Sequence, residues 1–184
     1  DTLAHKHVYS LLEDQSGQLW VGFSVGLQKL DLATGRFVEG WKTTGRLPRE
    51  HYAIVRCVQE DRSGGIWFGT DHGLYRLAEG NVRRFVKQDG LTADEIEAIF
   101  ETPSGKIWAL TGDEICQFDG TQFLPFGLTS HFARLWLRRI LHDREGEYWV
   151  GTFFGGLSRL KERNLVTLTT RDGLCHDDVW SISE

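Results

Sequence analysis

Acidic, histidine, threonine and aromatic residues recur in short polar segments of this 184-residue chain. Aromatic rings stack on sugar rings, and carboxylate, imidazole and hydroxyl groups form hydrogen bonds with sugar hydroxyls. Together these residue types favour the binding of a neutral polyol or an oligosaccharide. Each residue taken singly is also ordinary in a solvated loop, so the hypothesis rests on their gathering in space. The candidate ligand-binding residues are His51, Tyr52, Thr70, Asp71, His72, Asp94, Glu95, Phe153, Phe154, His176, Asp177 and Asp178.

Catalysis is the alternative chemistry for the same residues. His51, His72 and Glu95 are of the types that transfer protons in acid–base catalysis. However, the sequence contains no nucleophile elbow, HExxH motif or paired-carboxylate motif that would mark a catalytic centre. The spacing of His72 and His176–Asp178 does not support a metal site. We therefore expect no catalytic residue, no metal site and no cofactor.

Composition excludes further classes of function. The net charge of −5 argues against a nucleic-acid partner, which a basic face would be needed to bind. The basic pairs Arg83–Arg84 and Arg138–Arg139 are interpreted as solvated edges. No run of 18 apolar residues occurs, so we expect no direct membrane insertion by this segment. The three cysteines lack metal-finger spacing and are expected to be packed or idle thiols.

A repeated phrase around four tryptophans shows which elements position these residues. The indoles of Trp20, Trp67, Trp108 and Trp149 are spaced 47, 41 and 41 residues apart (20 to 67, 67 to 108, 108 to 149). A phrase such as QEDRSGGIWFGTDHGL surrounds each of them. Tandem units of this length predict an array of repeats. We expect these four tryptophans to be structural, because a large flat ring on an equivalent strand packs between neighbouring units.

Each unit contains four short runs that alternate apolar and polar residues, separated by glycine-containing turns such as DRSG and AEGN. Four short antiparallel strands per unit describe one blade of a β-propeller, and no unit has a helical segment of useful length. The predicted fold is therefore all-β, a β-propeller of four-stranded antiparallel blades. The predicted blades cover residues 7–51, 52–95, 96–135 and 136–178, and residues 179–184 form the first strand of a further blade.

The repeat resembles the two-component regulator propeller repeat. The second unit matches best, with Glu60–Asp61, Gly64, Trp67, Gly69–Thr70 and Asp89–Gly90–Leu91. The fourth unit keeps most of this pattern, while the third departs from it at Ala109–Leu110 and Glu114–Ile115, so its loop is expected to be altered. The resemblance implies the sensor region of a bacterial histidine kinase, hybrid two-component or diguanylate cyclase protein. It also implies a periplasmic or extracytoplasmic location, ligand sensing that is often of carbohydrate, and no catalysis within the propeller.

The ends of the chain leave the closure of the ring open. Four blades and one extra strand favour a fragment of a larger propeller. A closed four-bladed ring and an open array completed by association, such as a homodimer, are the alternatives. In the fragment interpretation the partner is the remainder of a longer sensor chain.

Chain order predicts where a ligand binds. If the first strand of each blade lies nearest the axis, the connections from second to third strand and from fourth to first strand emerge on one face. We call this the loop face, and it holds every candidate ligand-binding residue. The same connections also contain Ser24, Val25, Thr111–Asp113, Gly155 and His131–Arg134. Two other functions remain open: a propeller lyase or hydrolase resembling streptogramin lyase, and a protein-interaction scaffold using an apolar patch around Trp136, Phe153 and Phe154.

Overall fold

The computed structural model describes residues 7–42, 53–112, 114–127, 132, 134–161 and 164–182. These residues form four separate antiparallel sheets, each of four strands that are consecutive in the chain. The strands are β1 (Val8–Glu13), β2 (Leu19–Phe23), β3 (Gly26–Asp31), β4 (Arg36–Lys42), β5 (Val55–Glu60), β6 (Ile66–Thr70), β7 (Gly73–Ala78), β8 (Asn81–Phe85), β9 (Ala98–Glu101), β10 (Ile107–Thr111), β11 (Glu114–Phe118), β12 (Phe123–Pro125), β13 (Leu137–His142), β14 (Tyr148–Thr152), β15 (Leu157–Lys161) and β16 (Asn164–Leu168). Two short 3₁₀ helices, η2 (Lys87–Asp89) and η3 (Thr170–Asp172), follow β8 and β16. The prediction of an all-β fold built from four-stranded propeller blades is confirmed.

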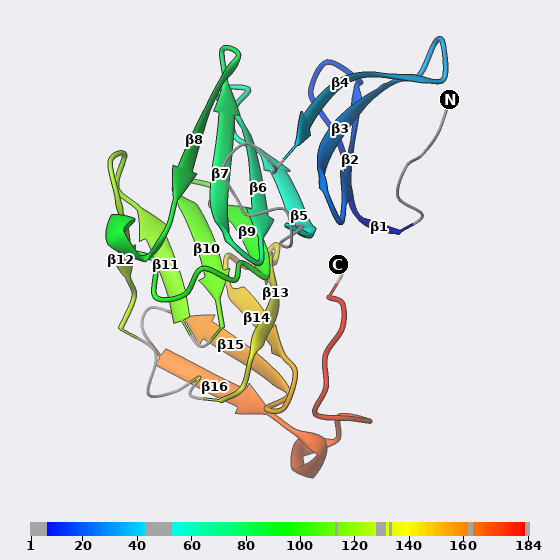
Figure 1. Ribbon diagram of the computed structural model, residues 1–184. Helices are drawn as coiled ribbons and strands as arrows, with labels where there is room; N and C mark the ends of the chain where they lie inside the picture. The colour runs from blue at the N-terminus through cyan, green and yellow to red at the C-terminus, as the bar shows by residue number, and fades with distance from the viewer. Residues whose placement is uncertain are drawn as a thin grey trace.

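The four sheets follow one another in an arc, as Figure 1 shows. The first strands of neighbouring blades touch: β1 contacts β5, β5 contacts β9, and β9 contacts β13. These first strands lie along the inside of the arc, and the fourth strands lie on its outside (Figure 1). Because the strands of each blade alternate in direction, the loop face is the face defined by the connections β2–β3 and β4–β5 and their equivalents.

The hydrophobic core is divided into three clusters, and each cluster lies between two blades. Trp20 packs with residues of the second blade, Trp67 with residues of the third, and Trp108 with residues of the fourth. All three indoles are buried, whereas Trp149 on the equivalent strand β14 is only partly buried. Covering about 200 Å² of indole contributes up to about 5 kcal/mol before side-chain entropy is subtracted. The tryptophans therefore join blade to blade.

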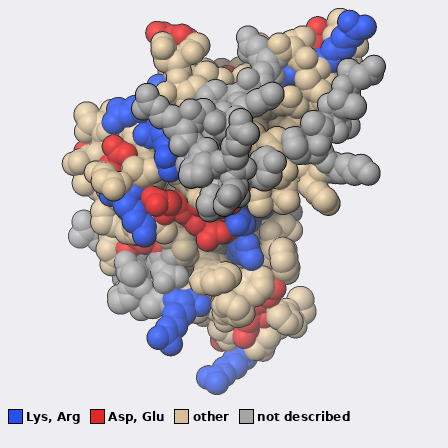
Figure 2. Space-filling model, viewed as in Figure 1, with Lys and Arg blue, Asp and Glu red and all other residues tan. Residues whose placement is uncertain are grey.

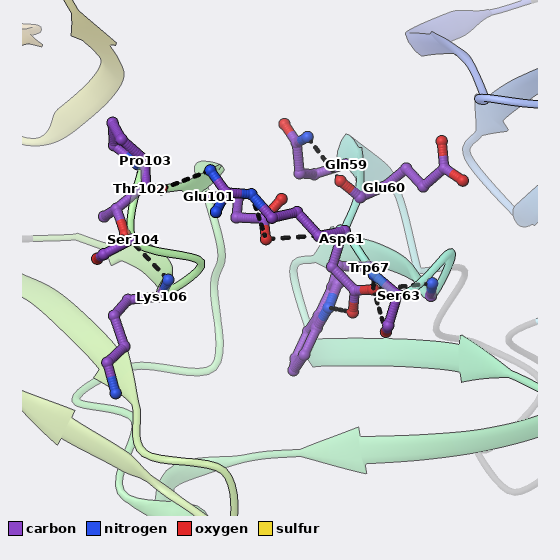
Figure 3. Close-up of polar contacts among 12 residues, drawn as sticks. Gln59, Glu60, Asp61, Ser63, Trp67, Glu101, Thr102, Pro103, Ser104 and Lys106 are labelled. Atoms are coloured by element: carbon purple, nitrogen blue, oxygen red, sulfur yellow. Dashed lines mark hydrogen bonds and ion pairs between the residues drawn. The ribbon is translucent and has the colours of Figure 1, made fainter.

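In three of the four blades a single carboxylate fixes the tryptophan and the hairpin before it. The Nε1 of Trp67 donates to Oδ2 of Asp61 at 2.7 Å, while Oδ1 of Asp61 accepts from the amides of Ser63 and Gly65 (Figure 3). Asp14 and Asp143 bind Trp20 and Trp149 in the same way, at 2.8 and 2.6 Å. This hydrogen bond has the same geometry in the three blades. It explains why an aspartate stands six positions before the tryptophan in each of them.

In the third blade a different hydrogen bond replaces the one between aspartate and indole. Thr102 stands where the other blades have aspartate, and its hydroxyl accepts from the amide of Lys106 and shares a hydrogen bond with the hydroxyl of Ser104 (Figure 3). The indole of Trp108 instead donates to Oε1 of Gln117 on the neighbouring strand, at 3.1 Å. The loss of the aspartate is thus compensated locally, and the third sheet keeps four strands.

A glycine on the second strand receives the next blade. A Cβ on Gly69 of β6 would lie 2.6 Å from the side chain of Ile96, the residue that leads into β9. A Cβ on Gly22 would lie 2.8 Å from Val55 of β5 in the same manner. We call this contact the glycine slot. It requires glycine because the incoming apolar side chain occupies the space of the missing Cβ.

The slot of the fourth blade is filled by residues beyond η3. A Cβ on Gly151 would lie 2.8 Å from Val179, and the amide of Val179 donates to the carbonyl of Thr152 at 2.9 Å. The amide of Ile96 makes the same bond to Thr70. Val179 therefore sits where the first strand of a further blade would start, although no strand is formed there.

The opposite end of the array has an uncovered face. Val8 on β1 is 51 % exposed, whereas the equivalent Val55, Ile96 and Leu137 are fully buried by the blade before them. Leu11 is likewise 61 % exposed, against 8 % for Ile99. Each blade covers the first strand of the blade that follows it. Among the described residues, no segment covers the first strand of the first blade in this way.

Candidate functional site

Three β-bulges at the start of the first strands shape the loop face near the axis. The register shifts between Val8 and Ser10, between Val55 and Cys57, and between Leu137 and Arg139. The bulged residues are Tyr9, Arg56 and Arg138. A bulge leaves one residue unpaired and turns its side chain away from the regular alternation of the strand. Equivalent positions in three blades thus present one phenol and two guanidinium groups.

Glu97 links the two bulged arginines. Its carboxylate lies 3.6 Å from Nη1 of Arg56 and 3.1 Å from Nη1 of Arg138. Arg56 also pairs with Glu95 at 2.6 Å, and that carboxylate is half exposed. We call these four residues the charged hub. Because Glu97 is largely buried and each guanidinium keeps a buried Nε without a hydrogen-bond partner, the hub holds its charges by pairing rather than by full hydration. Figure 2 shows acidic side chains flanked by basic ones near the middle of the viewed face.

Four aromatic rings lie beside the hub, and we call them the aromatic shelf: Trp136, Phe153, Phe154 and Trp180. Phe153 lies 4.5 Å from Phe154, 6.2 Å from Trp136 and 5.7 Å from Trp180, between ring centroids. The exposed fractions of Trp136, Phe154 and Trp180 are 54 %, 58 % and 66 %. A group of large exposed rings on one face is uncommon, which makes the shelf a candidate binding surface.

Arg138 joins the shelf to the hub. Its Cζ lies 4.7 Å from the centroid of the Phe153 ring and 5.4 Å from that of Trp180. The same guanidinium pairs with Glu97. A guanidinium that contacts two rings and pairs with one carboxylate has little conformational freedom. A ligand that moves the rings would therefore also move the charge of Arg138. The interpretation of Arg138 as a solvated edge residue is therefore wrong, because the bulge turns it into this contact.

Backbone strain accompanies the shelf. Arg134 and Trp136 have φ angles of +64° and +50°, a region that residues with a Cβ avoid. The amide of Phe153 donates to the carbonyls of Leu135 and Trp136, both at 2.9 Å, and holds this loop in place. Such conformations persist at binding sites, where the surrounding structure over-determines them.

Several of the predicted residues have structural partners. The carboxylates of Asp94 and Asp177 accept from the amides of Lys87 and Thr170 and so cap the two 3₁₀ helices. Oδ1 of Asp71 accepts from the amide of Ile54 at 3.1 Å. Thr70 is buried, and its hydroxyl donates to the carbonyl of Gly73. These bonds build the loops that carry the site.

The other predicted residues are spread over several parts of the loop face or lie outside the described residues. Glu95 belongs to the hub, and Phe153 and Phe154 belong to the shelf. The ring Nδ1 of His176 accepts from the amide of Asp178, whose Oδ1 is buried without a hydrogen-bond partner. The carbonyl of His72 accepts from Arg84, whose side chain is on the exposed edge strand β8. His51, Tyr52, Asp113 and His131 lie outside the described residues.

Sequence reasoning missed Arg56 and Glu97. Arg56 is the second residue of β5, and Glu97 lies just before β9, at the position that Tyr9 and Arg138 occupy in β1 and β13. Aligning the repeats on the apolar residue before each of them marks this column. Nothing in the sequence shows the β-bulges that direct the side chains at this position toward the axis. Within the described ranges no group of three or more His, Cys, Asp or Glu residues is arranged to hold a metal ion. The described residues also contain no helix long and apolar enough to cross a membrane.

Comparison with known proteins agrees with the repeat pattern. The two component regulator propeller family model matches residues 2–24 and 51–72, which contain Trp20 and Trp67. These two segments match the repeat of that family, and they make up less than half of the chain. No curated protein matches the chain in sequence.

Solved structures with this propeller fold include two extracellular domains described as parts of hybrid two-component systems of B. thetaiotaomicron. Both are 21 % identical to the chain, with TM-scores of 0.77 and 0.67, and they cover 93 % and 90 % of it. Virginiamycin B lyase from Staphylococcus aureus is 17 % identical, with a TM-score of 0.70 over 87 % of the chain. The chain spans 24 % of the length of each sensor domain and 54 % of the lyase. At these identities the likeness concerns the fold alone.

Proposed function

We propose that this propeller segment is the ligand-sensing part of a bacterial signal-transduction protein and that its loop face binds an oligosaccharide. The family of the repeats and the extracellular sensor domains that share the fold support the sensory role. The same comparisons favour an extracytoplasmic location and a longer sensor chain as the immediate partner.

One observation carries the choice of ligand. The aromatic shelf and the charged hub lie side by side and are joined by Arg138. Exposed rings such as Trp136 offer flat apolar faces for pyranose rings, and the half-exposed Glu95 accepts hydrogen bonds from hydroxyl groups. A site with both kinds of group suits a sugar, which has an apolar face and a polar rim.

The relay of a signal follows from the same contacts. A sugar on the shelf restrains Phe153 and Trp180, and these rings hold Arg138. Arg138 and Arg56 share Glu97, so one carboxylate connects the second, third and fourth blades. Binding on the shelf thereby favours one arrangement of three blades over others, which is the differential interaction that a sensor requires.

We propose a binding role rather than catalysis. A propeller enzyme needs an imidazole and a carboxylate within hydrogen-bond reach of one substrate. The carboxylates of Asp94 and Asp177 are committed to capping helices, and that of Glu95 to Arg56. The rival function, a protein-interaction scaffold, would use the same rings without saturable binding of a small ligand.

The test is calorimetric titration of the 184-residue chain with cello-, xylo-, manno- and maltohexaose. At least one is expected to bind saturably, and Trp136→Ala should weaken that binding about tenfold or more, since stacking on one ring contributes about 1–3 kcal/mol. Val38→Ala, which removes an equally exposed apolar side chain on β4, should leave it unchanged. Equal affinity in both variants, or turnover of the sugar, would sink the proposal.

A further inference from the structure

A second concave surface lies on the axis, lined by the first strands of all four blades. It is a cavity of about 280 Å³, and residues of β1, β5 and β13 and both Ala98 and Ile99 of β9 line it. Its size is at the lower end of ligand sites, so it suits a small molecule. None of the four shelf residues lines it, although Arg56 of the charged hub does.

The cavity has an apolar wall and a basic wall. Leu11, Val58, Ile99 and Ile140 stand at equivalent positions of the four first strands and form the apolar part. Arg56 and Arg139 supply the charged part, Tyr9 and Ser10 add hydroxyl groups, and none of the described residues that line the cavity is acidic. Because Arg56 is paired with Glu95 and Glu97, the local positive charge is that of Arg139.

Arg139 differs from the other arginines near the axis in having no carboxylate partner. Its Nη1 donates to the carbonyls of Arg138 at 2.8 Å and of Glu97 at 3.3 Å. Arg56 and Arg138 are instead neutralised by Glu95 and Glu97. In the part of the chain that the structure describes, no salt bridge reaches Arg139, so its charge is available to a ligand.

The surroundings of Arg139 supply no counter-charge. Burial raises the pKa of the Cys57 thiol to about 12, and the nearby Arg139 charge only partly opposes that rise. The thiol is therefore neutral at physiological pH. The exposed Arg139 guanidinium can hold a carboxylate through charge-assisted hydrogen bonds while the apolar wall contacts the rest of the ligand.

We propose that this axial cavity binds a small organic acid. The carboxylate of the ligand lies on the free edge of the Arg139 guanidinium, and its apolar body packs against Leu11, Ile99 and Ile140. An acid with a short aliphatic or aromatic body has the dimensions and the polarity of the cavity. The two sites share Arg56, but the acid site rests on Arg139 and the cavity lining and the sugar site on the aromatic shelf, so either can fail without the other.

The probe for the test is 3-phenylpropionate, titrated calorimetrically into the 184-residue chain, with 3-phenylpropanamide as the neutral analogue of the same shape. The acid is expected to bind saturably and at least tenfold more tightly than the amide. Because both titrations use the unaltered chain, this comparison does not depend on the folding of a variant. Equal binding of acid and amide, or no saturable binding of the acid, overturns the proposal.

Variants then locate the site. Arg139→Gln should weaken binding of the acid at least tenfold, and Arg139→Lys should retain part of it. Arg171→Gln removes the same charge from the exposed η3 helix and should have no effect. Leu11→Asn should weaken binding of the acid while leaving the fold intact, since Leu11 is already exposed. Unchanged affinity in Arg139→Gln, with circular dichroism showing a folded protein, places the acid elsewhere and rejects the site.

Discussion

The carboxylate of Asp61 orders a hairpin and an indole at once. Burial of Asp61 raises its pKa, but hydrogen bonds from Ser63, Trp67, Gly65 and Arg76 outweigh this, and the net pKa is lowered. The side chain is about one-tenth exposed, so its loss leaves the Trp67 Nε1 and two amides with fewer partners. The repeated aspartate is therefore a structural residue of the blade.

Asp61→Ala is expected to lower the free energy of unfolding by roughly 2 kcal/mol, because it removes a charge-assisted bond and the cap of the turn. Urea titration followed by tryptophan fluorescence measures the change. Asp119→Ala is the matched control, since Asp119 caps a turn between β11 and β12 without binding an indole. A loss no greater than that of the control would show that the indole bond contributes nothing.

Stability should also depend on pH through these aspartates. The pKa of Asp14, Asp61 and Asp143 is lowered in the folded chain by hydrogen bonds that favour the ionised form. A lowered folded pKa contributes stability above the usual aspartate value of 3.8 and loses it as the pH falls through that value and below. The free energy of unfolding should therefore decrease from pH 5 to pH 3, and less steeply in Asp61→Asn. Identical slopes in wild type and variant would contradict this origin.

At the scale of elements, the glycine slot determines how closely blades pack. Gly69→Ala should destabilise the chain by about 1–3 kcal/mol, because the new Cβ would lie 2.6 Å from Cys57 Sγ and from Ile96. In the third blade Leu110, not glycine, stands at the equivalent position, two residues after Trp108, and is fully buried. As a comparison, Ala109→Gly introduces a glycine at the neighbouring strand position without filling the slot and should cost about 0.5–1 kcal/mol. Thermal unfolding measures the stability of both variants. An unchanged stability in Gly69→Ala would show that the second and third blades separate easily.

The sequence predicted strands and turns well because each depends on local pattern: alternation, a tight glycine turn and the aspartate before the indole. It predicted the site less well because the site depends on contacts between blades. Asp94 and Asp177 were expected to meet ligand, yet their nearest partners are amides of their own loops. Arg138 was expected in solvent, yet a bulge and two rings from other segments hold it.

At the scale of the whole molecule, the arc is asymmetric. Residues after η3 already fill the slot of the fourth blade, while the face of β1 is open. Val179 therefore occupies the position that Val8 would need in order to close a ring of four blades. The geometry favours a further blade against β1, or association of this face with another copy.

An open apolar face should make the 184-residue chain associate as its concentration rises. Light scattering between about 0.1 and 10 mg/ml is expected to show a rising mass, and Val8→Asp should suppress the rise. Val38→Asp places the same charge on an equally exposed position of β4 and should not suppress it. A constant monomer mass at all concentrations would mean that the β1 face has no affinity for another blade.

The measurement that tests the central claim most directly is hydrogen–deuterium exchange with and without the tightest-binding hexaose. Binding on the loop face predicts slower exchange of amides in 134–139, 153–156 and 177–180, which carry the aromatic shelf and Arg138. The opposite hairpins, residues 14–18, 61–65 and 143–147, should be unchanged. Protection confined to those hairpins, or spread evenly over the chain, would contradict a sensor site on the loop face.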